Sequence, residues 1–481
     1  MRNKLHRMLL EMVGAALLLS GCAAPHAQLR NTSVAPGENL GSVQPIVALD
    51  DEHLRQTVGD RVTERYKEFT LSFVEFDDQG KFWNKDQQLS AIDRLSAEPD
   101  AAANGAIILV FIHGWFNNAD VCNGNVKLFR KTLLELSKTE QDRSNKKRPG
   151  QPDRPPRRVI GVFVGWRGLS QKWQPAKSLS FWARKNTAHK IGFGDMDELL
   201  VHLDELKQQL AHGRSSTRLV TVGHSFGGAM LYSSVDNLLK ERTRRDILEA
   251  QHNPDGTIVP PLIRGAFGDL VVLVNPAFEA LRYSGLAEAA ASMQKCNPLQ
   301  TTVFMIVGAQ NDQATGRLLP IGQSIPALTQ NFKSSAERRQ YTTAVGHYDE
   351  YFTELLDARP TAPIQTEGKQ ARPLIWKEEN LSIHNTNTVE RAHSWQDFVP
   401  VEGRRSWKIH SLPPGSRHPL NAPVMVVSAT PAVIDGHSGI YSHVFLEFLR
   451  DFIVAQDILK EYHETKGAAK IGGAGGEINT Q

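Results

Sequence analysis

Apolar residues fall into two patterns along this chain from about residue 70 onward. Continuous apolar runs alternate with stretches in which apolar residues recur every three or four positions. A continuous run indicates a strand buried on both faces, and the longer spacing indicates a helix with one apolar face. The alternation predicts an α/β fold whose mostly parallel sheet is flanked by helices. The expected strands are 71–78, 106–115, 159–168, 219–222, 270–277, 301–309 and 422–429, and the expected helices are 126–138, 193–210, 229–241 and 443–459.

Five segments depart from this alternation. Residues 71–78 (LSFVEFDD) alternate apolar and polar positions, which predicts an edge strand. Residues 22–60 begin with a polar stretch rich in Ala, Ser, Pro and Gly, which predicts a flexible tether. Residues 139–158 are basic and proline-rich, which favours a solvated loop over contact with anionic lipid headgroups. The segment 314–420 is long and mixed, with a helical pattern at residues 342–356, and the composition of residues 466–481 predicts a disordered tail.

The N-terminus, MRNKLHRMLLEMVGAALLLSGC, carries basic residues, a short apolar stretch and small residues before Cys22. The apolar stretch is too short to span a bilayer, and its flanks predict a signal peptide at residues 1–21. The ending LSGC resembles the bacterial lipobox, which implies that Cys22 is lipidated and anchors the chain to a membrane. Glu11 departs from the usual apolar pattern, and a plain secretory signal is the alternative. Ala23 resembles the outer-membrane default, so we expect an outer-membrane location facing the periplasm.

Charge and short motifs narrow the classes of partner. The 55 basic and 52 acidic residues give a net charge of +3, which is no reason to expect a nucleic-acid partner. Neither nucleotide-binding nor metal-binding spacings occur, so we expect no cofactor and no metal. A disulfide between Cys122 and Cys296 is disfavoured, because the predicted fold places them near opposite edges of the sheet.

The main chemical signal is the stretch TRLVTVGHSFGGAML at residues 217–231. A buried strand runs directly into Gly-x-Ser-x-Gly and then into a helix, which is the context of a nucleophile turn. Side chains at Gly223 or Gly227 would collide with the neighbouring strand or helix. Ser225 would then lie over a helix N-terminus, where backbone N–H groups favour negative charge. Ser225 is the predicted nucleophile, and a plain serine in a glycine-rich turn is the alternative.

This arrangement, with FIHGW at residues 111–115, resembles the α/β-hydrolase fold and in particular lipase- and esterase-like serine hydrolases. The resemblance runs from about residue 105 to 455. It implies an α/β-hydrolase domain over residues 61–465, with a cap or insertion around 314–420 between the acid and histidine loops. An accessory subdomain packed around the same tryptophans is the alternative for that insertion, which contains Trp376, Trp395 and Trp407.

The order of catalytic groups in that family is nucleophile, acid, histidine. Asp312 follows the strand 301–309 by three residues and is the expected acid. Asp269 precedes its strand and belongs at the opposite edge of the sheet. Asn275 holds the other common acid position and cannot supply a carboxylate. A plain turn aspartate is the alternative role for Asp312.

His437 lies in the loop between the last strand and the C-terminal helix, where the resemblance places the catalytic base. His443 is a rival, but it lies where that helix starts. His224 is adjacent to the nucleophile and cannot face it, and His113 is expected to support the HGW loop. The histidines of the inserted region are weaker candidates: His347, His410 and His418.

The resemblance also implies an oxyanion hole formed by the backbone N–H groups of Phe226 and Trp115. The expected activity is that of a membrane-anchored serine hydrolase acting on an acyl ester through an acyl-enzyme. His437 would take the proton of Ser225, and Asp312 would orient the imidazole. An acyltransferase with the same triad, or a non-catalytic scaffold lipoprotein of the hydrolase fold, is the alternative.

Overall fold

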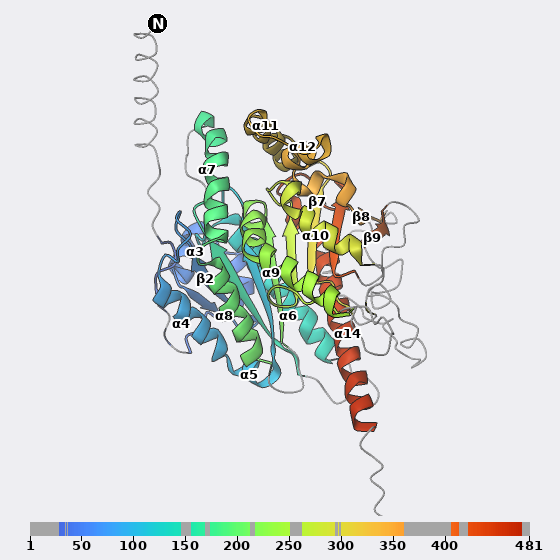
Figure 1. The fold of residues 1–481 in the computed structure, drawn as a ribbon. Coiled ribbons are helices and arrows are strands. Elements are labelled where there is room, and N and C mark those ends of the chain that lie inside the picture. The colour runs from blue at the N-terminus through green and yellow to red at the C-terminus, as the bar shows by residue number, and fades with distance from the viewer. Residues whose placement is uncertain are drawn as a thin grey trace, which may run out of the picture.

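The computed structural model contains one mixed sheet of ten strands among its described residues, with helices on both faces (Figure 1). The strand order is β1-β2-β4-β3-β5-β6-β7-β10-β8-β9. The strands are β1 (Thr63–Arg65), β2 (Phe69–Glu75), β3 (Ala106–Ile112), β4 (Arg158–Gly165), β5 (Arg218–His224), β6 (Leu270–Val274), β7 (Phe304–Ala309), β8 (Glu354–Ala358), β9 (Trp407–Ser411) and β10 (Val424–Ala429). The structure describes residues 28–33, 35, 37–145, 155–168, 174–211, 217–250, 262–293, 297, 300–359, 406–412 and 422–473.

The strands between the two edges all run parallel, and only β1 and β9 pair antiparallel with their neighbours. Every residue of β3 is buried, as its continuous apolar sequence predicts. Ile112 pairs in register with Gly223 of β5, and Ala309 at the end of β7 pairs with Ala429 of β10. Because the strands are parallel, their carboxyl ends meet at one edge of the sheet, which we call the carboxyl edge.

Two apolar layers cover the sheet, one on each face. One layer contains α2 (Val43–Val47), α3 (Asp51–Val58), α6 (Gly124–Asn145) and α14 (His443–Gly473). The other contains α4 (Lys85–Ser96), α5 (Pro99–Asn104), α7 (Gln174–Gly192), α8 (Met196–Gln209), α9 (Phe226–Ala250) and α10 (Ala280–Ser292). Two short helices, α11 (Leu319–Ser324) and α12 (Ser335–Thr342), lie beyond one end of the sheet, near the end of α7 (Figure 1).

The predicted α/β architecture with a mostly parallel sheet is confirmed, but the prediction of an edge strand at 71–78 is wrong. The strand β2 lies between β1 and β4, and all its residues are buried. Its polar side chains tolerate burial because they have partners. Ser72 shares a hydrogen bond of 3.0 Å with Thr63, and the Thr70 hydroxyl donates to Glu98 at 2.8 Å.

The prediction of a flexible tether over 22–60 is wrong for the part that the structure describes. Arg30 is only 1% exposed, and its guanidinium donates to Glu64 at 2.9 Å. Val43 of α2 and Leu54 of α3 belong to the core. The polar composition of this segment concealed apolar residues spaced for two short helices, which therefore belong to the folded domain.

The basic stretch 139–158 is not a loop throughout. Helix α6 continues to Asn145, and β4 begins at Arg158. Arg143 and Arg157 are buried in ion pairs rather than exposed, so charge alone did not mark the end of the helix.

Three predictions near the C-terminus also need correction. The helical pattern at 342–356 forms two short 3-10 turns, η3 (Val345–His347) and η4 (Asp349–Tyr351), followed by β8 of the main sheet. Trp407, which we expected in a cap, is buried in β9 and its indole N–H donates to Asp451 at 3.1 Å. Helix α14 continues to Gly473, beyond the expected start of a disordered tail. Trp376 and Trp395 lie outside the described residues.

Within the described residues, no helix is both long and apolar enough to cross a membrane. The signal peptide predicted at 1–21 and Cys22 lie outside the described residues, as does Cys296. Cys122 is a free thiol whose Sγ donates to the carbonyl of Asp51 at 3.3 Å.

Candidate active site

Three side chains from separate strand ends meet at the carboxyl edge of the sheet. Ser225 lies between β5 and α9, Asp312 follows β7, and His437 follows β10. His437 Nε2 lies 2.7 Å from Ser225 Oγ, and His437 Nδ1 lies 2.8 Å from Asp312 Oδ2. Ser225 and Asp312 are each 2% exposed, whereas the His437 side chain is 21% exposed. The three residues that the resemblance singled out thus lie in one chain of hydrogen bonds.

The turn at Ser225 holds the backbone in a left-handed conformation, with φ +57°. Such a conformation costs a non-glycine residue about 1–3 kcal/mol, so the surroundings must impose it. The N–H of Ser225 donates to the carbonyl of Val274 at 3.0 Å, and its own carbonyl accepts from Ala229 and Ala277, each at 3.1 Å. These bonds to α9 and to the end of β6 fix the direction of the Ser225 side chain.

Glycines let the surrounding backbone approach this turn, as the sequence predicted. A Cβ atom at Gly223 would lie 2.7 Å from the carbonyl oxygen of Gly227, and one at Gly227 would overlap the carbonyl of Ile112. A Cβ atom at Gly114 would lie 2.8 Å from Ser225 Cβ. The His-Gly-Trp loop after β3 therefore packs directly against the serine.

Two backbone N–H groups at this contact remain available to a ligand. Phe226 is the first residue of α9, so its N–H has no partner within the helix. In the loop after β3, the N–H of Phe116 donates to Gly168 at 3.3 Å, but no described atom accepts from the N–H of Trp115. Phe226 and Trp115 are the two residues that sequence reasoning singled out as donors to an oxyanion.

His113 supports the loop after β3, as expected. Its Nε2 accepts from the backbone N–H of Trp166 at 3.1 Å, so its Nδ1 is the protonated nitrogen and donates to Gly114 at 2.9 Å. The indole of Trp166 donates back to the carbonyl of His113 at 2.9 Å. His113 thereby fixes the loop that presents Trp115.

Asp312 is held as a carboxylate. Its Oδ1 accepts the N–H groups of Ala314 at 2.8 Å and Thr315 at 3.3 Å, and its Oδ2 also accepts the Thr315 hydroxyl. Burial alone would raise the pKa of Asp312, but the hydrogen bonds from His437 and Thr315 outweigh it and hold that pKa below its ordinary value. The group facing His437 is therefore negatively charged at neutral pH.

Two residues that sequence reasoning did not assign hold the backbone of His437. Its carbonyl accepts from His224 Nε2 at 2.9 Å and from Asn275 Nδ2 at 3.0 Å. Burial, with the nearby His437, lowers the pKa of His224 to about 3, so His224 is neutral and donates through Nε2. The amide oxygen of Asn275 accepts the N–H of Ala309 at 2.8 Å. The position of Asn275, where the resembled family often has its acid, was the one sequence feature that could have indicated its role in the site.

The remaining acid and histidine candidates lie elsewhere. Asp269 accepts the N–H of Leu219 at 2.9 Å and pairs with Lys207, near the amino ends of β5 and β6. His410 lies in β9 and His443 begins α14, and His418 lies outside the described residues. In the described structure, Ser225 has no hydrogen bond to Asp269, His410 or His443.

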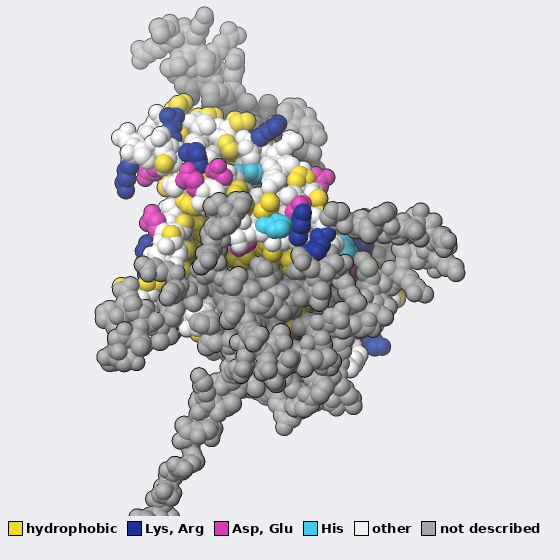
Figure 2. All heavy atoms as spheres, turned by 90° about the vertical axis from the view of Figure 1, so that its right-hand side faces the viewer, with side chains coloured by type: hydrophobic (Ala, Val, Ile, Leu, Met, Phe, Trp, Pro, Cys, Tyr) yellow, Lys and Arg dark blue, Asp and Glu magenta, His cyan; other side chains and the backbone are white. Residues whose placement is uncertain are grey.

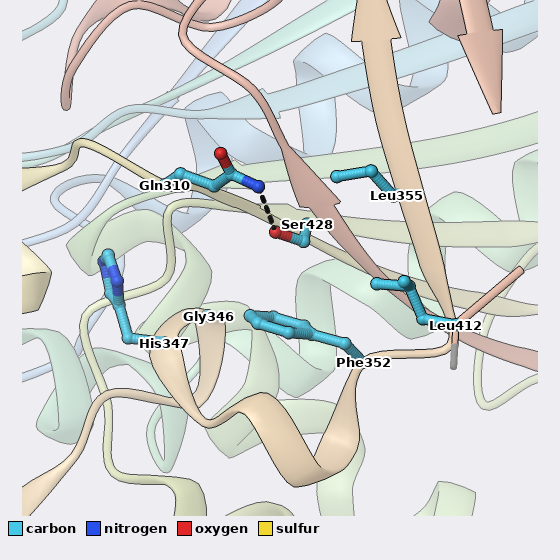
Figure 3. A pocket seen from close by; sticks show the side chains of 7 residues that line it. All are labelled: Gln310, Gly346, His347, Phe352, Leu355, Leu412 and Ser428. Carbon is cyan, nitrogen blue, oxygen red and sulfur yellow. Dashed lines mark hydrogen bonds between the residues drawn. The ribbon is translucent and has the colours of Figure 1, made fainter. Parts of the chain in front are cut away.

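His347 lies close to Asp312, with the hydroxyl of Thr315 between them. Its Nε2 is 3.0 Å from Thr315 Oγ1. Thr315 is in turn hydrogen-bonded to Asp312, the residue that contacts His437. Figure 3 shows His347 at one end of a cavity of about 410 Å³. The cavity is lined by Gln310, Gly346, His347, Phe352, Leu355, Leu412 and Ser428.

Aromatic side chains surround the His-Gly-Trp loop. The ring of Trp115 meets Phe181 of α7 edge-on at 5.4 Å, and Phe181 lies 4.8 Å from Phe226. The neighbouring Trp182 packs against Gly322 of α11, where a Cβ atom would overlap the indole. Phe181 and Trp182 of α7 thus form an aromatic wall beside the loop of Trp115, and α11 packs against Trp182.

The surface in Figure 2 mixes acidic, basic and apolar side chains over the part that the structure describes.

Comparison with protein-family models, curated proteins and solved structures gave no match to this chain. Within the described residues, no three His, Cys, Asp or Glu side chains are grouped to hold a metal ion. A serine hydroxyl bonded to an imidazole, itself bonded to a buried carboxylate, can act as an activated nucleophile.

Proposed function

We propose that this protein is a serine hydrolase of the α/β-hydrolase fold that cleaves carboxylic esters through an acyl-enzyme. Ser225 is the nucleophile, His437 the general base and Asp312 the group that orients the imidazole. The observation that carries the proposal is the unbroken hydrogen-bond chain from Ser225 Oγ through both nitrogens of His437 to Asp312. A non-catalytic scaffold would not require that chain to stay intact.

In the first half of the reaction, His437 Nε2 takes the proton of Ser225 as Oγ attacks the ester carbonyl. The N–H groups of Phe226 and Trp115 stabilise the oxyanion, and one such donor contributes about 3 kcal/mol. His437 then gives its proton to the leaving alcohol. In the second half, His437 deprotonates a water that attacks the acyl-enzyme, and Ser225 recovers its proton.

The aromatic wall of α7 supports an ester with an apolar acyl group as substrate. Phe181 and Trp182 lie beside the loop of Trp115, where they can cover apolar surface of a bound acyl chain. An acyltransferase would use the same first half-reaction and differ only in the acyl acceptor.

The proposed site of membrane attachment is Cys22, through lipidation after cleavage of the signal peptide. The lipobox-like sequence LSGC supports this assignment. It would place the hydrolase on the periplasmic face of an outer membrane.

A fluorophosphonate probe tests the proposed nucleophile, because an activated serine attacks its phosphorus, displaces fluoride and becomes phosphonylated. We expect labelling of the native wild type and of Ser324→Ala, which removes an exposed serine on α11, but not of Ser225→Ala. Hydrolysis of p-nitrophenyl esters of graded acyl length should fall in Ser225→Ala by on the order of 10⁵-fold or more. Absence of labelling in the native wild type, or equal labelling of Ser225→Ala, would contradict the proposal.

A further inference from the structure

A single hydroxyl connects Asp312 to His347. Thr315 Oγ1 is hydrogen-bonded to Asp312 Oδ2 and lies 3.0 Å from His347 Nε2. A hydroxyl has one proton to donate, and an ionised carboxylate can only accept. The proton of Thr315 therefore goes to Asp312, and Oγ1 accepts the Nε2–H of His347.

From this arrangement we infer that His347 is a positioning residue for the catalytic triad, acting through Thr315 on Asp312. The inference rests on the proposed function of Ser225. By donating to Thr315, His347 prevents the hydroxyl from turning away, so that the hydroxyl proton stays directed at Asp312 Oδ2.

The two oxygens of Asp312 are held in different ways, which explains why this hydroxyl matters. Oδ1 accepts two backbone N–H groups of its own turn, those of Ala314 and Thr315. Oδ2 is the oxygen that His437 contacts, and the other group that holds it is the Thr315 hydroxyl. The orientation of His437 therefore depends on Thr315 and, through it, on His347.

The ring of His347 is fixed against the same turn. A Cβ atom at Gly316 would lie only 3.0 Å from His347 Cε1, so the ring packs closely on the backbone beside Thr315. Burial lowers the pKa of His347, which keeps the ring neutral and makes the position of its one N–H decisive. The cavity beside the ring gives substituted side chains room without displacing the turn (Figure 3).

Four variants of the full-length protein test the inference, with kcat and KM measured on an ester that the wild type hydrolyses. Thr315→Val removes the hydroxyl, and His347→Met removes the donor to it. We expect each to lower kcat about 10-fold at unchanged KM. His347→Gln can donate through its amide and should remain within about threefold of wild type. Thr315→Ser keeps the hydroxyl, and its kcat should also remain within about threefold of wild type.

The double variant Thr315→Val/His347→Met separates this mechanism from independent structural roles. If His347 acts through Thr315, the double variant loses no more kcat than Thr315→Val alone. Multiplied losses, an effect on KM instead of kcat, or equal activity of His347→Gln and His347→Met would overturn the inference. Circular dichroism identifies variants that do not fold, and the pair Thr315→Val and Thr315→Ser then tests the hydroxyl without changing the ring.

Labelling of Ser225 distinguishes failure of this inference from failure of the proposed function. A wild type that the fluorophosphonate probe does not label contradicts the function itself. A labelled, active wild type whose Thr315 and His347 variants keep full kcat contradicts only the role of His347.

Discussion

Asn275 shows how one residue at a strand end can serve the site without supplying its acid. Its backbone lies in the left-handed region at φ +47°, which asparagine tolerates better than most residues. From there its amide nitrogen donates to the carbonyls of Gly436 and His437, while its oxygen accepts the N–H of Ala309. One side chain thus ties the loop of His437 to the end of β7, the strand that carries Asp312.

Asn275→Asp should lower kcat by about 10- to 100-fold with little change in KM. The substitution keeps the oxygen that accepts from Ala309, but it replaces the donor with a carboxylate oxygen that repels the carbonyl of His437. Steady-state hydrolysis of an ester measures the effect. Asn84→Asp is the control, because Asn84 caps α4 at the surface and aspartate caps equally well. Unchanged kcat in Asn275→Asp would show that His437 needs no such support.

At the residue scale, local sequence predicted which groups meet but not what holds them. Ser225, Asp312 and His437 each follow a recognisable apolar strand, and the resemblance to the α/β-hydrolase order of catalytic groups was enough to predict that they meet. The contact of Asn275 with His437 joins positions 162 residues apart, and the contact of Thr315 with His347 joins positions 32 residues apart, with α11 and α12 between them. Neither contact leaves a periodic pattern in the sequence.

At the element scale, the site depends on how closely the loop after β3 approaches the turn between β5 and α9. Gly114 is the point of contact, where an added Cβ atom would lie 2.8 Å from Ser225 Cβ and 3.1 Å from the carbonyl of His224. The next residue is Trp115, the proposed second oxyanion donor. A shift of this loop therefore moves the donor away from the serine.

Gly114→Ala should reduce kcat by about 10²- to 10³-fold, the cost of losing one oxyanion donor. The methyl group cannot fit without displacing the loop that carries Trp115. Gly124→Ala is a matched control, since nothing lies within 4 Å of a Cβ atom at Gly124. Ester hydrolysis measures the loss, and thermal unfolding verifies that Gly114→Ala remains folded. A folded variant with full activity would contradict the proposed position of the oxyanion hole.

Element boundaries were predicted well where burial is apolar and poorly where it is polar. The apolar runs located β3, β5 and β10 within a few residues. In contrast, β8 pairs in parallel with β10 and antiparallel with β9, a strand about fifty positions later in the chain. Leu355, Asp357 and Ala358 of β8 are only partly buried. A short strand of this kind is specified by its neighbours in the sheet rather than by its own sequence.

At the scale of the whole molecule, the edge of the sheet opposite the site is held by buried charge. Asp457 of α14 pairs with Arg143 of α6, with Arg157 before β4 and with Arg218 at the start of β5. Glu140 pairs with Arg157 as well, at 2.8 Å. The network joins the last helix to one helix and two strands from the first half of the chain.

Asp457→Asn should lower the free energy of unfolding by about 3–5 kcal/mol at pH 7, because it leaves buried arginines without their shared carboxylate. Burial alone would raise the pKa of Asp457, but its arginine neighbours hold that pKa well below the ordinary value of 3.8. The stabilisation is therefore complete above the pKa of the unfolded chain and is lost as the pH falls toward the lower pKa of the folded state.

Urea unfolding at pH 7 and at successively lower pH measures this contribution. The difference between wild type and Asp457→Asn should shrink as the pH falls below about 4. Glu241→Gln is the control, since Glu241 and Arg245 form an exposed pair with both side chains more than half accessible. Its effect should stay within about 0.5 kcal/mol. A loss in Asp457→Asn no larger than that of Glu241→Gln would mean that apolar packing alone holds α14 to the sheet.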